Sequence, residues 1–243
     1  MYINVIEKTN MYESLLRLPY FQGMSKDELT QILDKVKLDF ISTTNGESIV
    51  RQGEKCNRFI ILLKGFFTAE TLSEDGSYKL TELIEAPYAL EPYSLFGRST
   101  DYKRGYTAKG EGSILGIDKS YFYSDFMKRN IFTINLLNLI CHKTQLLSRI
   151  TWEDAPECIE GKIARFIAQR SETLSGQKHL TIRMEQLASQ LHETRINISR
   201  ALNSLQQKGL VELSRKEINI PSFEKLLQES WQISMHKSSI YIP

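Results

Sequence analysis

The chain has 243 residues, 41% of them hydrophobic and 25% charged, which is ordinary for a soluble protein of one or two domains. No apolar run reaches the ~18 residues of a membrane span, and the N-terminal MYINVIEKTNMYE lacks the basic and apolar regions of a signal peptide. Three widely spaced cysteines, Cys56, Cys141 and Cys158, fit neither a disulfide framework nor a metal site, so we expect a cytoplasmic protein. Because the net charge is only +2, a nucleic-acid-binding function must be argued from where the positive charge lies.

The first half of the chain is predicted to be a helical region followed by a β-rich domain. Residues 11–37 are expected to be helical, because apolar side chains recur there at helical spacing: Leu29, Ile32, Leu33 and Val36. From Ile41 to Ile117, short β-branched and aromatic runs alternate with glycine turns. Two of these runs, FIILLKGFFTAETL and YKLTELI, are joined by residues 73–76 and predict a hairpin. Short strands at this density are typical of an antiparallel sandwich or barrel.

Residues 121–151 are predicted to form a long helix with two apolar stripes. The first has nearly the spacing of a coiled-coil heptad and contains Phe132, Leu136, Leu139, Leu146 and Ile150. The second lies beside it and contains Leu137, Ile140 and Leu147. If one stripe docks on the β-rich domain, the other is left for a partner, which is typical of a dimerising helix; the alternative is a helix wholly buried within one chain. The following WEDAP, residues 152–156, interrupts the pattern, so we place a domain hinge there.

The C-terminal part of the chain has the element order of a winged helix. Residues 159–170 are amphipathic, and two further helical segments follow, 184–191 and HETRINISRALNSLQQKGLV at 192–211. The stretch LVELSRKEINI has apolar residues on both sides of a charged tip, Arg215-Lys216-Glu217, and predicts a β-hairpin.

A helix-turn-helix unit is predicted within this region. Such units have a small residue in the first helix, a residue that tolerates positive φ at the turn, and an aliphatic anchor in the second helix. Ala188, His192 and Ile198 occupy these positions; glycine is usual at the turn, but histidine tolerates positive φ better than most residues. Thr194 is expected to be the N-cap of the second helix, and its hydroxyl could alternatively contact a phosphate.

The second helix has an apolar face and an unusual polar face. Ile198, Ala201, Leu202 and Leu205 form the apolar face, and the first turns of the other side carry Arg195, Ile196, Asn197, Ser199 and Arg200. Arg is suited to guanine O6 and N7, and Asn to adenine N6 and N7, so this face is predicted to read bases in the major groove of double-stranded DNA. The alternative is that these polar side chains only solvate an exposed helix.

Positive charge gathers in the same region. Between Lys178 and Lys216 there are seven Lys or Arg and three Glu, a local net charge of +4. Phosphate contacts, which position a protein on DNA without specifying sequence, are expected from Arg183, Thr194, Lys208, Arg215 and Lys216.

Over about residues 15–221 the chain resembles the cyclic-AMP receptor protein and fumarate-nitrate regulator (Crp/Fnr) family of bacterial transcription regulators. The likeness is carried by NGESIVRQGEKCNRFIILLKG (residues 45–65), by the long helix, and by the winged-helix stretch LTIRMEQLASQLHETRINISRALNSLQQKGLVELSRKEINI. Most specific is the T-R-x-x-x-x-R core formed by Thr194, Arg195 and Arg200, which lies where the family makes base and phosphate contacts.

The resemblance implies an α+β fold with a cyclic-nucleotide-binding-type β-roll and N-terminal helix (1–120), a dimerisation helix (121–152), and a winged helix-turn-helix domain with a C-terminal tail (153–243). It also implies a homodimer on a near-palindromic operator, with RNA polymerase as a further partner. Many family members carry Glu where this chain has Ile196. That Glu accepts a hydrogen bond from cytosine N4, whereas isoleucine can only make an apolar contact, for which the thymine methyl is suited.

The residues expected at an effector site depart from those of the family's cyclic-AMP binders. Leu90-Glu91 replaces a Gly-Glu pair, and Tyr102-Lys103 stands where Arg followed by Ser or Thr is found, with Arg104 next to it. The family's base-contacting Thr-Ser pair falls at Leu147-Ser148. Glu91 and Arg104 could still hold a sugar hydroxyl and a phosphate, but we do not expect cyclic AMP to be the effector. A packed or empty roll, or a different small ligand, is expected. No iron–sulfur cofactor is expected, because the family's iron–sulfur sensors use an N-terminal cysteine cluster and the first forty residues contain no Cys.

These observations predict a sequence-specific DNA-binding transcription regulator, controlled allosterically by a small molecule at the β-roll, and not an enzyme. The alternative is a ligand-binding or enzymatic β-roll protein whose helical C-terminus does not bind DNA. No Ser-His-Asp set, paired carboxylates or metal-ligand cluster stands out in the sequence, and Glu91 alone is weak evidence for catalysis.

Overall fold

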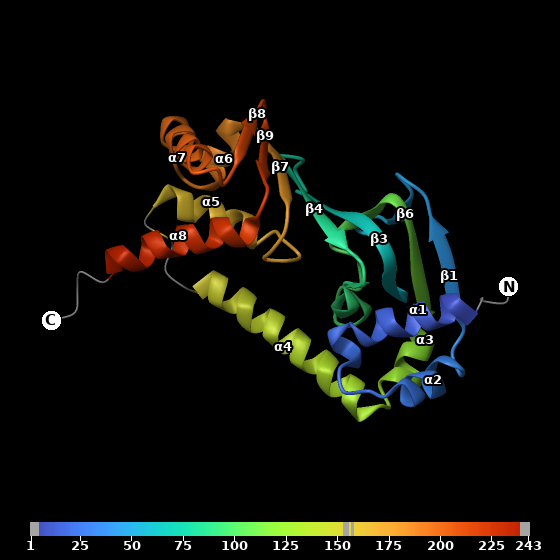
Figure 1. Ribbon diagram of the computed structural model, residues 1–243. Helices are drawn as coiled ribbons and strands as arrows, with labels where there is room; N and C mark the ends of the chain where they lie inside the picture. The colour runs from blue at the N-terminus through green and yellow to red at the C-terminus, as the bar shows by residue number, and fades with distance from the viewer. Residues whose placement is uncertain (1–4, 153–155, 157, 239–243) are drawn as a thin grey trace. The chain divides into compact units, whose positions relative to one another are not determined.

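The computed structural model describes residues 5–152, 156 and 158–238, and the chain forms two compact units (Figure 1). Unit 1 comprises the described residues up to Thr68 together with Ile84–Leu146, and unit 2 comprises Ala69–Leu83 with the described residues from Leu147 onward. The chain therefore passes between the units within β3 (Arg58–Leu72), within β4 (Tyr78–Glu85) and within α4 (Asn130–Trp152). Residues 69–83 lie in unit 2. The expected domain bounds at 120 and 152 instead kept this segment with the β-rich domain. The expected hinge at 152–156 falls largely on residues outside the described ones.

Unit 1 contains antiparallel strands, as predicted for the first half of the chain, but two of them are longer than expected: β3 has 15 residues and β6 (Gly105–Asp118) has 14. β6 pairs with β1 (Leu38–Thr43) from Leu38↔Ile117 to Thr43↔Gly112, and β2 (Ser48–Val50) pairs with the start of β6. β3 neighbours β6 on the other side and pairs with β5 (Tyr88–Leu90). Gly65 and Gly112 allow the close approach of β3 and β6, since a Cβ on Gly112 would lie 2.7 Å from the Lys64 carbonyl oxygen.

The N-terminal helical region is interrupted, so the prediction of helix over 11–37 was partly wrong. α1 (Val5–Leu16) is followed by a 3₁₀ turn at Pro19–Phe21 and then by α2 (Lys26–Leu33), and β1 begins at Leu38. Pro19 cannot continue the first helix because it lacks a backbone N–H. Ser25 starts α2 with a capping box, in which its hydroxyl accepts from the Glu28 N–H at 3.2 Å and Glu28 accepts from the Ser25 N–H at 2.8 Å.

The long helix begins later than predicted. Residues 119–126 form two short helical segments, α3 (Lys119–Tyr121) and a π-helical turn (Phe122–Phe126), and α4 starts at Asn130. Phe132 on the first turn of α4 is fully buried in an aromatic cluster of unit 1 with Phe21, Phe59, Phe122 and Phe126. The first part of α4 is thus fixed to unit 1 by apolar packing.

Unit 2 has the predicted winged-helix order, with an additional strand. α5 (Ile159–Ala168) is followed by β7 (Lys178–Ile182), α6 (Met184–Gln190), α7 (Arg195–Gln207), the hairpin β8 (Glu212–Ser214) and β9 (Glu217–Ile220), and α8 (Phe223–Ser238). The strand order is β4-β7-β9-β8. In Figure 1, α6, α7 and the β8–β9 hairpin lie together within this unit. The predicted succession of antiparallel strands, long helix and winged helix-turn-helix is confirmed.

Candidate DNA-binding surface

The helix-turn-helix is formed by α6 and α7 as the sequence predicted. Ile198, Ala201, Leu202 and Leu205 of α7 are all buried, as are Leu187 and Ala188 of α6. His192 adopts φ 53, and the following Glu193 N–H donates to the Ala188 carbonyl at 2.9 Å. The positive φ expected at the turn is therefore present without a glycine.

The N-terminus of α7 is capped by Thr194. Its side-chain oxygen accepts from the Asn197 N–H at 3.2 Å, which satisfies one of the unpaired donors of the first turn. The predicted cap is confirmed. A phosphate that approaches this hydroxyl would meet the positive end of the helix dipole as well.

Glu193 anchors the turn to α5, a role that the sequence analysis missed. Lys162 Nζ lies 2.6 Å from Glu193 Oε1, and Asn197 Nδ2 donates to Glu193 Oε2 at 3.5 Å. The hydrogen bond from Lys162 is the main reason why the pKa of Glu193 is lowered. Asn197 is half-buried and turned toward this carboxylate, so it is less available for base contacts than its neighbours.

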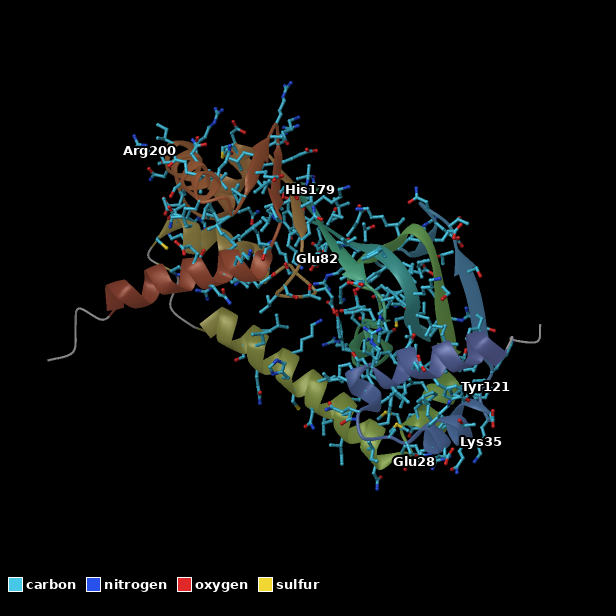
Figure 2. All side chains as sticks on the ribbon, in the orientation of Figure 1. Glu28, Lys35, Glu82, Tyr121, His179 and Arg200 are labelled. Carbon is cyan, nitrogen blue, oxygen red and sulfur yellow. The ribbon has the colours of Figure 1, made fainter. Side chains whose placement is uncertain are left out.

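Three of the predicted base-reading side chains are exposed. Arg195, Ile196 and Arg200 lie on the solvent side of α7, and Ile196 is 64% exposed, which is high for an isoleucine. Arg200 is labelled in Figure 2. Ser199 is half-buried on the same turns. Arg195 Nη1 lies 3.3 Å from Glu185 Oε1, but both side chains are mostly exposed, so this ion pair is weak and leaves the guanidinium able to exchange partners.

The wing brings further cationic side chains next to the start of α7. Arg215 and Lys216 form the exposed tip of the β8–β9 hairpin, and Lys216 adopts φ 66 in its turn. The Ile182 N–H donates to the Lys216 carbonyl at 2.9 Å, which fixes this tip against β7. A groove of about 350 Å³ lies between the hairpin and the helices, and its cationic lining residues are Arg183, Arg195, Arg215 and Lys216.

Lys208 is separate from this group. It follows the last turn of α7, whose 13 residues span about 20 Å. Its Nζ lies 2.6 Å from Glu229 Oε1 of α8. The structure therefore does not bring Lys208 together with the other predicted phosphate contacts.

In unit 1, Glu91 and Arg104, two of the residues expected at an effector site, belong to a buried polar cluster. Leu90 and Glu91 are fully buried, and Glu91 has φ 36. The Glu91 carboxylate accepts from Lys103 N at 2.8 Å, Ser94 Oγ at 3.0 Å and Tyr106 Oη at 3.3 Å. Arg104, also buried, places Nη1 3.6 Å from Glu91 Oε1 and donates to Tyr93 Oη at 3.3 Å.

The other effector candidates do not join this cluster through their side chains. The Lys103 side chain is exposed, and its Nζ donates to Ser99 Oγ at 3.1 Å. Leu147 and Ser148 are exposed on α4, in the part of the helix that belongs to unit 2. Tyr93 and Tyr106, which the sequence analysis did not select, provide hydroxyl partners for the buried pair.

Neither a metal cluster nor a membrane span was found in the described part of the chain. No group of three or more His, Cys, Asp or Glu among these residues is arranged to hold a metal ion. None of the described helices is long and apolar enough to cross a membrane.

Comparison with known proteins identifies the C-terminal domain. Residues 161–229 match the model of the Crp-like helix-turn-helix domain. No curated protein sequence matches the chain significantly.

Similar solved structures include the catabolite activator protein of Thermus thermophilus, with 18% identity, coverage of 88% of this chain and 98% of that one, and a TM-score of 0.49. DNR of Pseudomonas aeruginosa has 17% identity, coverage of 93% and 98%, and a TM-score of 0.45. The c-di-GMP-responsive global regulator CLP of Xanthomonas campestris has 15% identity, coverage of 81% and 99%, and a TM-score of 0.44.

Because these TM-scores are below 0.5, the assignment rests on the domain match and on the geometry of α6, α7 and the wing. Residues 161–229 are a Crp-like helix-turn-helix domain, as the resemblance of the winged-helix stretch predicted.

Proposed function

We propose that the chain is a homodimeric transcription regulator that reads a near-palindromic DNA site with α7. The observation that supports this most strongly is the exposed face of α7, where Arg195, Ile196 and Arg200 project from a helix whose other face is buried. The cationic wing tip, Arg215 and Lys216, borders the same groove and is suited to phosphate contacts. As a transcription regulator the protein would also contact RNA polymerase. We also propose a cytoplasmic location for such a regulator.

The dimer contact is proposed to lie along an exposed heptad seam on α4. Every third or fourth residue from 134 is exposed, with the 3-4-3-4 spacing of a coiled coil: Ile134, Leu137, Cys141, Thr144 and Ser148. Ile134 is 57% and Leu137 58% exposed, which is unfavourable for large apolar side chains in water. We call these five residues the exposed seam.

Of the two apolar stripes predicted on this helix, the one with Phe132 and Leu136 is less suited to a dimer contact. Phe132 and Leu136 are buried in unit 1, and Leu139 and Leu146 are half-buried. Double substitution of Leu139 and Leu146 would therefore disturb packing within one chain as well as any dimer. The exposed seam is the better target.

Base reading by α7 is proposed to combine one polar and one apolar contact. The guanidinium of Arg195 can donate to O6 and N7 of a guanine, a contact that contributes about 1–3 kcal/mol of discrimination. Ile196 has no hydrogen-bonding group and is suited to a thymine methyl. In a dimer the two copies of α7 would enter major grooves about 34–36 Å apart. Because each copy carries Arg195 and Ile196, each half-site is expected to contain a guanine and a nearby thymine.

Replacing Ile196 with Glu is expected to shift preference from T·A toward C·G at one base pair in each half-site. The new carboxylate can accept a hydrogen bond from cytosine N4, and the thymine contact is lost, so the relative affinities should change by about 1–3 kcal/mol. Selection from a randomised DNA pool with wild-type protein and Ile196→Glu measures this. If neither protein selects any sequence, the proposed function is wrong, and a β-roll protein that does not bind DNA becomes the better interpretation.

Arg215→Ala is the matched control for this experiment. It is expected to weaken binding to all sequences alike and to make the negative slope of log affinity against log salt shallower by about one unit. Lys208→Ala is expected to have a smaller effect, because Lys208 is paired with Glu229 away from the groove. Identical base preferences in wild type and Ile196→Glu would show that Ile196 does not face the bases.

Cyclic AMP is expected to bind weakly or not at all. The Glu91 carboxylate, the candidate acceptor for a ribose hydroxyl, already accepts from Lys103 N, Ser94 Oγ and Tyr106 Oη, and Arg104 lies beside it. A nucleotide would have to displace these internal partners. Isothermal titration calorimetry of the purified protein with cyclic AMP measures this, and stoichiometric micromolar binding would contradict the prediction.

A further inference from the structure

Residues 69–83 form part of the sheet of unit 2 although they are far from the rest of that unit in sequence. β4 pairs with β7 antiparallel over five residues, from Tyr78↔Ile182 to Glu82↔Lys178. Leu80 and Leu180, which face each other in this ladder, are both fully buried. β7 in turn pairs with β9, from Lys178↔Ile220 to Thr181↔Glu217. A continuous hydrogen-bonded ladder therefore connects β4, through β7, to the strand that follows the wing tip.

The β4–β7 pairing ends in an ion pair that is completely buried. Glu82 and Lys178 have side chains with 0% exposure, and Lys178 Nζ donates to Glu82 Oε2. Glu82 is labelled in Figure 2. Glu82 also accepts from the backbone N–H groups of Glu172 at 2.6 Å and Thr173 at 3.2 Å, and Lys178 Nζ donates to Thr173 Oγ1 at 2.8 Å. Separation of β4 from β7 would leave two charges and two N–H groups without these partners, which is strongly unfavourable away from water.

The other end of the β4–β7 ladder is held by aromatic contacts. The Tyr78 ring lies edge-on to Phe166 of α5 at a centroid distance of 5.4 Å. The Arg170 guanidinium carbon lies 5.1 Å from the Tyr78 ring centroid and 3.8 Å from that of Phe166. Residues 69–83 are thus attached to α5 as well as to β7, within one compact unit.

From these contacts we infer that Glu82 is a positioning residue for DNA binding and that residues 69–83 move with the winged helix as one body. Glu82 does not touch DNA; it fixes β4 on β7, and β7 fixes β9 and the wing tip. This inference rests on the proposed function. It places the limits of this body near 68–69 and 83–84, where the chain passes between the units, in addition to the expected hinge at 152–156.

A disulfide between β4 and β7 provides a direct test. Thr81 and His179 are paired in register and half-buried, outside the Glu82–Lys178 face. Directly opposed residues of an antiparallel pair have Cα atoms about 4.5–5.5 Å apart, which is within the range of a disulfide. Thr81→Cys/His179→Cys would be made in full-length protein carrying Cys56→Ala, Cys141→Ala and Cys158→Ser, with and without Glu82→Gln. Serine is chosen at 158 because Cys158 Sγ accepts from the Gly161 N–H as the N-cap of α5.

The affinity of each protein for the DNA selected by wild type would be measured after reduction and after oxidation with oxidised glutathione. In the reduced state, the Thr81→Cys/His179→Cys protein that carries Glu82→Gln is expected to bind DNA about tenfold more weakly than the same protein with Glu82. A change of this size is within the usual range of coupling between two sites. Oxidation is expected to restore binding to within about threefold, because the disulfide replaces the ion pair in holding β4 on β7. With Glu82 intact, oxidation should change the affinity by less than about twofold.

A second disulfide distinguishes positioning from general stabilisation. Glu212 and Asn219 are opposed in the β8–β9 hairpin, and Glu212→Cys/Asn219→Cys would strengthen the wing without joining β4 to β7. This control is expected not to rescue Glu82→Gln. Equal rescue by both disulfides would overturn the inference. So would unchanged DNA binding by reduced Glu82→Gln. Loss of DNA binding on forming the β4–β7 disulfide in a protein with Glu82 intact would also overturn it.

Hydrogen exchange separates failure of this inference from failure of the proposed function. In reduced Glu82→Gln the amides of β7 are expected to exchange faster than in the parent protein, and oxidation of the Thr81→Cys/His179→Cys pair should restore their protection. This readout requires no DNA. If the protein selects no DNA but exchange responds as expected, the proposed function fails while the attachment of residues 69–83 stands. If exchange of β7 is unchanged by Glu82→Gln, the inference fails whatever the protein binds.

Discussion

Replacing Ile134 and Leu137 together with Glu is expected to give a monomeric protein that loses tight operator binding. Both side chains are more than half exposed on α4 and begin the exposed seam. Two carboxylates brought against their symmetry copies in an apolar contact would repel each other and lose solvation. A dimer binds its second half-site as an intramolecular step, which raises affinity by about 10²–10⁴, so a loss of this size is expected for the monomer.

The mass of the protein in solution and its affinity for the selected DNA measure the two parts of this prediction. His142→Glu is the matched control, because His142 is exposed on the same helix but lies outside the exposed seam. It is expected to remain dimeric. An Ile134→Glu/Leu137→Glu protein that is still dimeric would place the dimer contact on another surface.

The native Cys141 offers an independent readout of the same seam. Cys141 is exposed at the centre of the seam, and in a parallel two-fold dimer it would face the partner's Cys141. Oxidised glutathione is expected to convert the two thiols into an intersubunit disulfide and to be reduced in the process. The pair Cys141→Ser/His142→Cys, which moves the thiol out of the seam, is expected not to cross-link.

The features of the DNA-binding surface that the sequence predicted are determined by local chemistry. The Thr194 cap, the positive φ of His192 and the buried face of α7 each depend on residues within a few positions of one another. The predictions of a continuous helix through Pro19 and of a long helix from residue 121 were less accurate. Apolar spacing continues through short turns and does not mark where a helix begins or ends.

The assignment of the two stripes on α4 could not be made from the sequence. Leu137 belongs to one apolar stripe and Leu139 to the other, and both have the spacing of a buried face. Only packing shows that the stripe with Phe132 and Leu136 is used within the chain. The spacing of Ile134, Leu137 and Cys141 already indicated the exposed seam in the sequence. The next two positions at this spacing, Thr144 and Ser148, are polar, so the apolar pattern was too short to be recognised.

The ion pair of Glu82 and Lys178 was beyond sequence reasoning for a different reason. The two residues are 96 positions apart, and no local pattern pairs one with the other. In the sequence Glu82 lies at strand spacing between Leu80 and Ile84, on the face that is buried, but the sequence analysis did not select it. Lys178 contributed to the local positive charge taken as evidence for DNA binding. Since it is fully buried, Lys178 cannot contribute to that surface.

Exposed and buried ion pairs of unit 2 should differ sharply in their contribution to stability. Lys208 and Glu229, 42% and 37% exposed, form a matched control for Lys178 and Glu82. Lys208→Met is expected to change the free energy of unfolding by less than about 1 kcal/mol, because water and salt screen an exposed pair. Exchange of the slowest amides in unit 2 measures this quantity without requiring the whole chain to unfold in one step.

Glu82→Ala is expected to destabilise unit 2 by about 3–5 kcal/mol, because it leaves the buried Lys178 ammonium without its carboxylate. Lys178→Met should cost less, since the Glu82 carboxylate keeps the N–H groups of Glu172 and Thr173. The double variant Glu82→Gln/Lys178→Met should be more stable than Glu82→Gln alone, because the amide oxygen can still accept these N–H bonds and no buried charge remains. The same exchange measurement gives the double-mutant cycle, with an expected coupling of about 2–3 kcal/mol. Additive effects of the two substitutions would show that Glu82 and Lys178 do not stabilise each other in the folded protein.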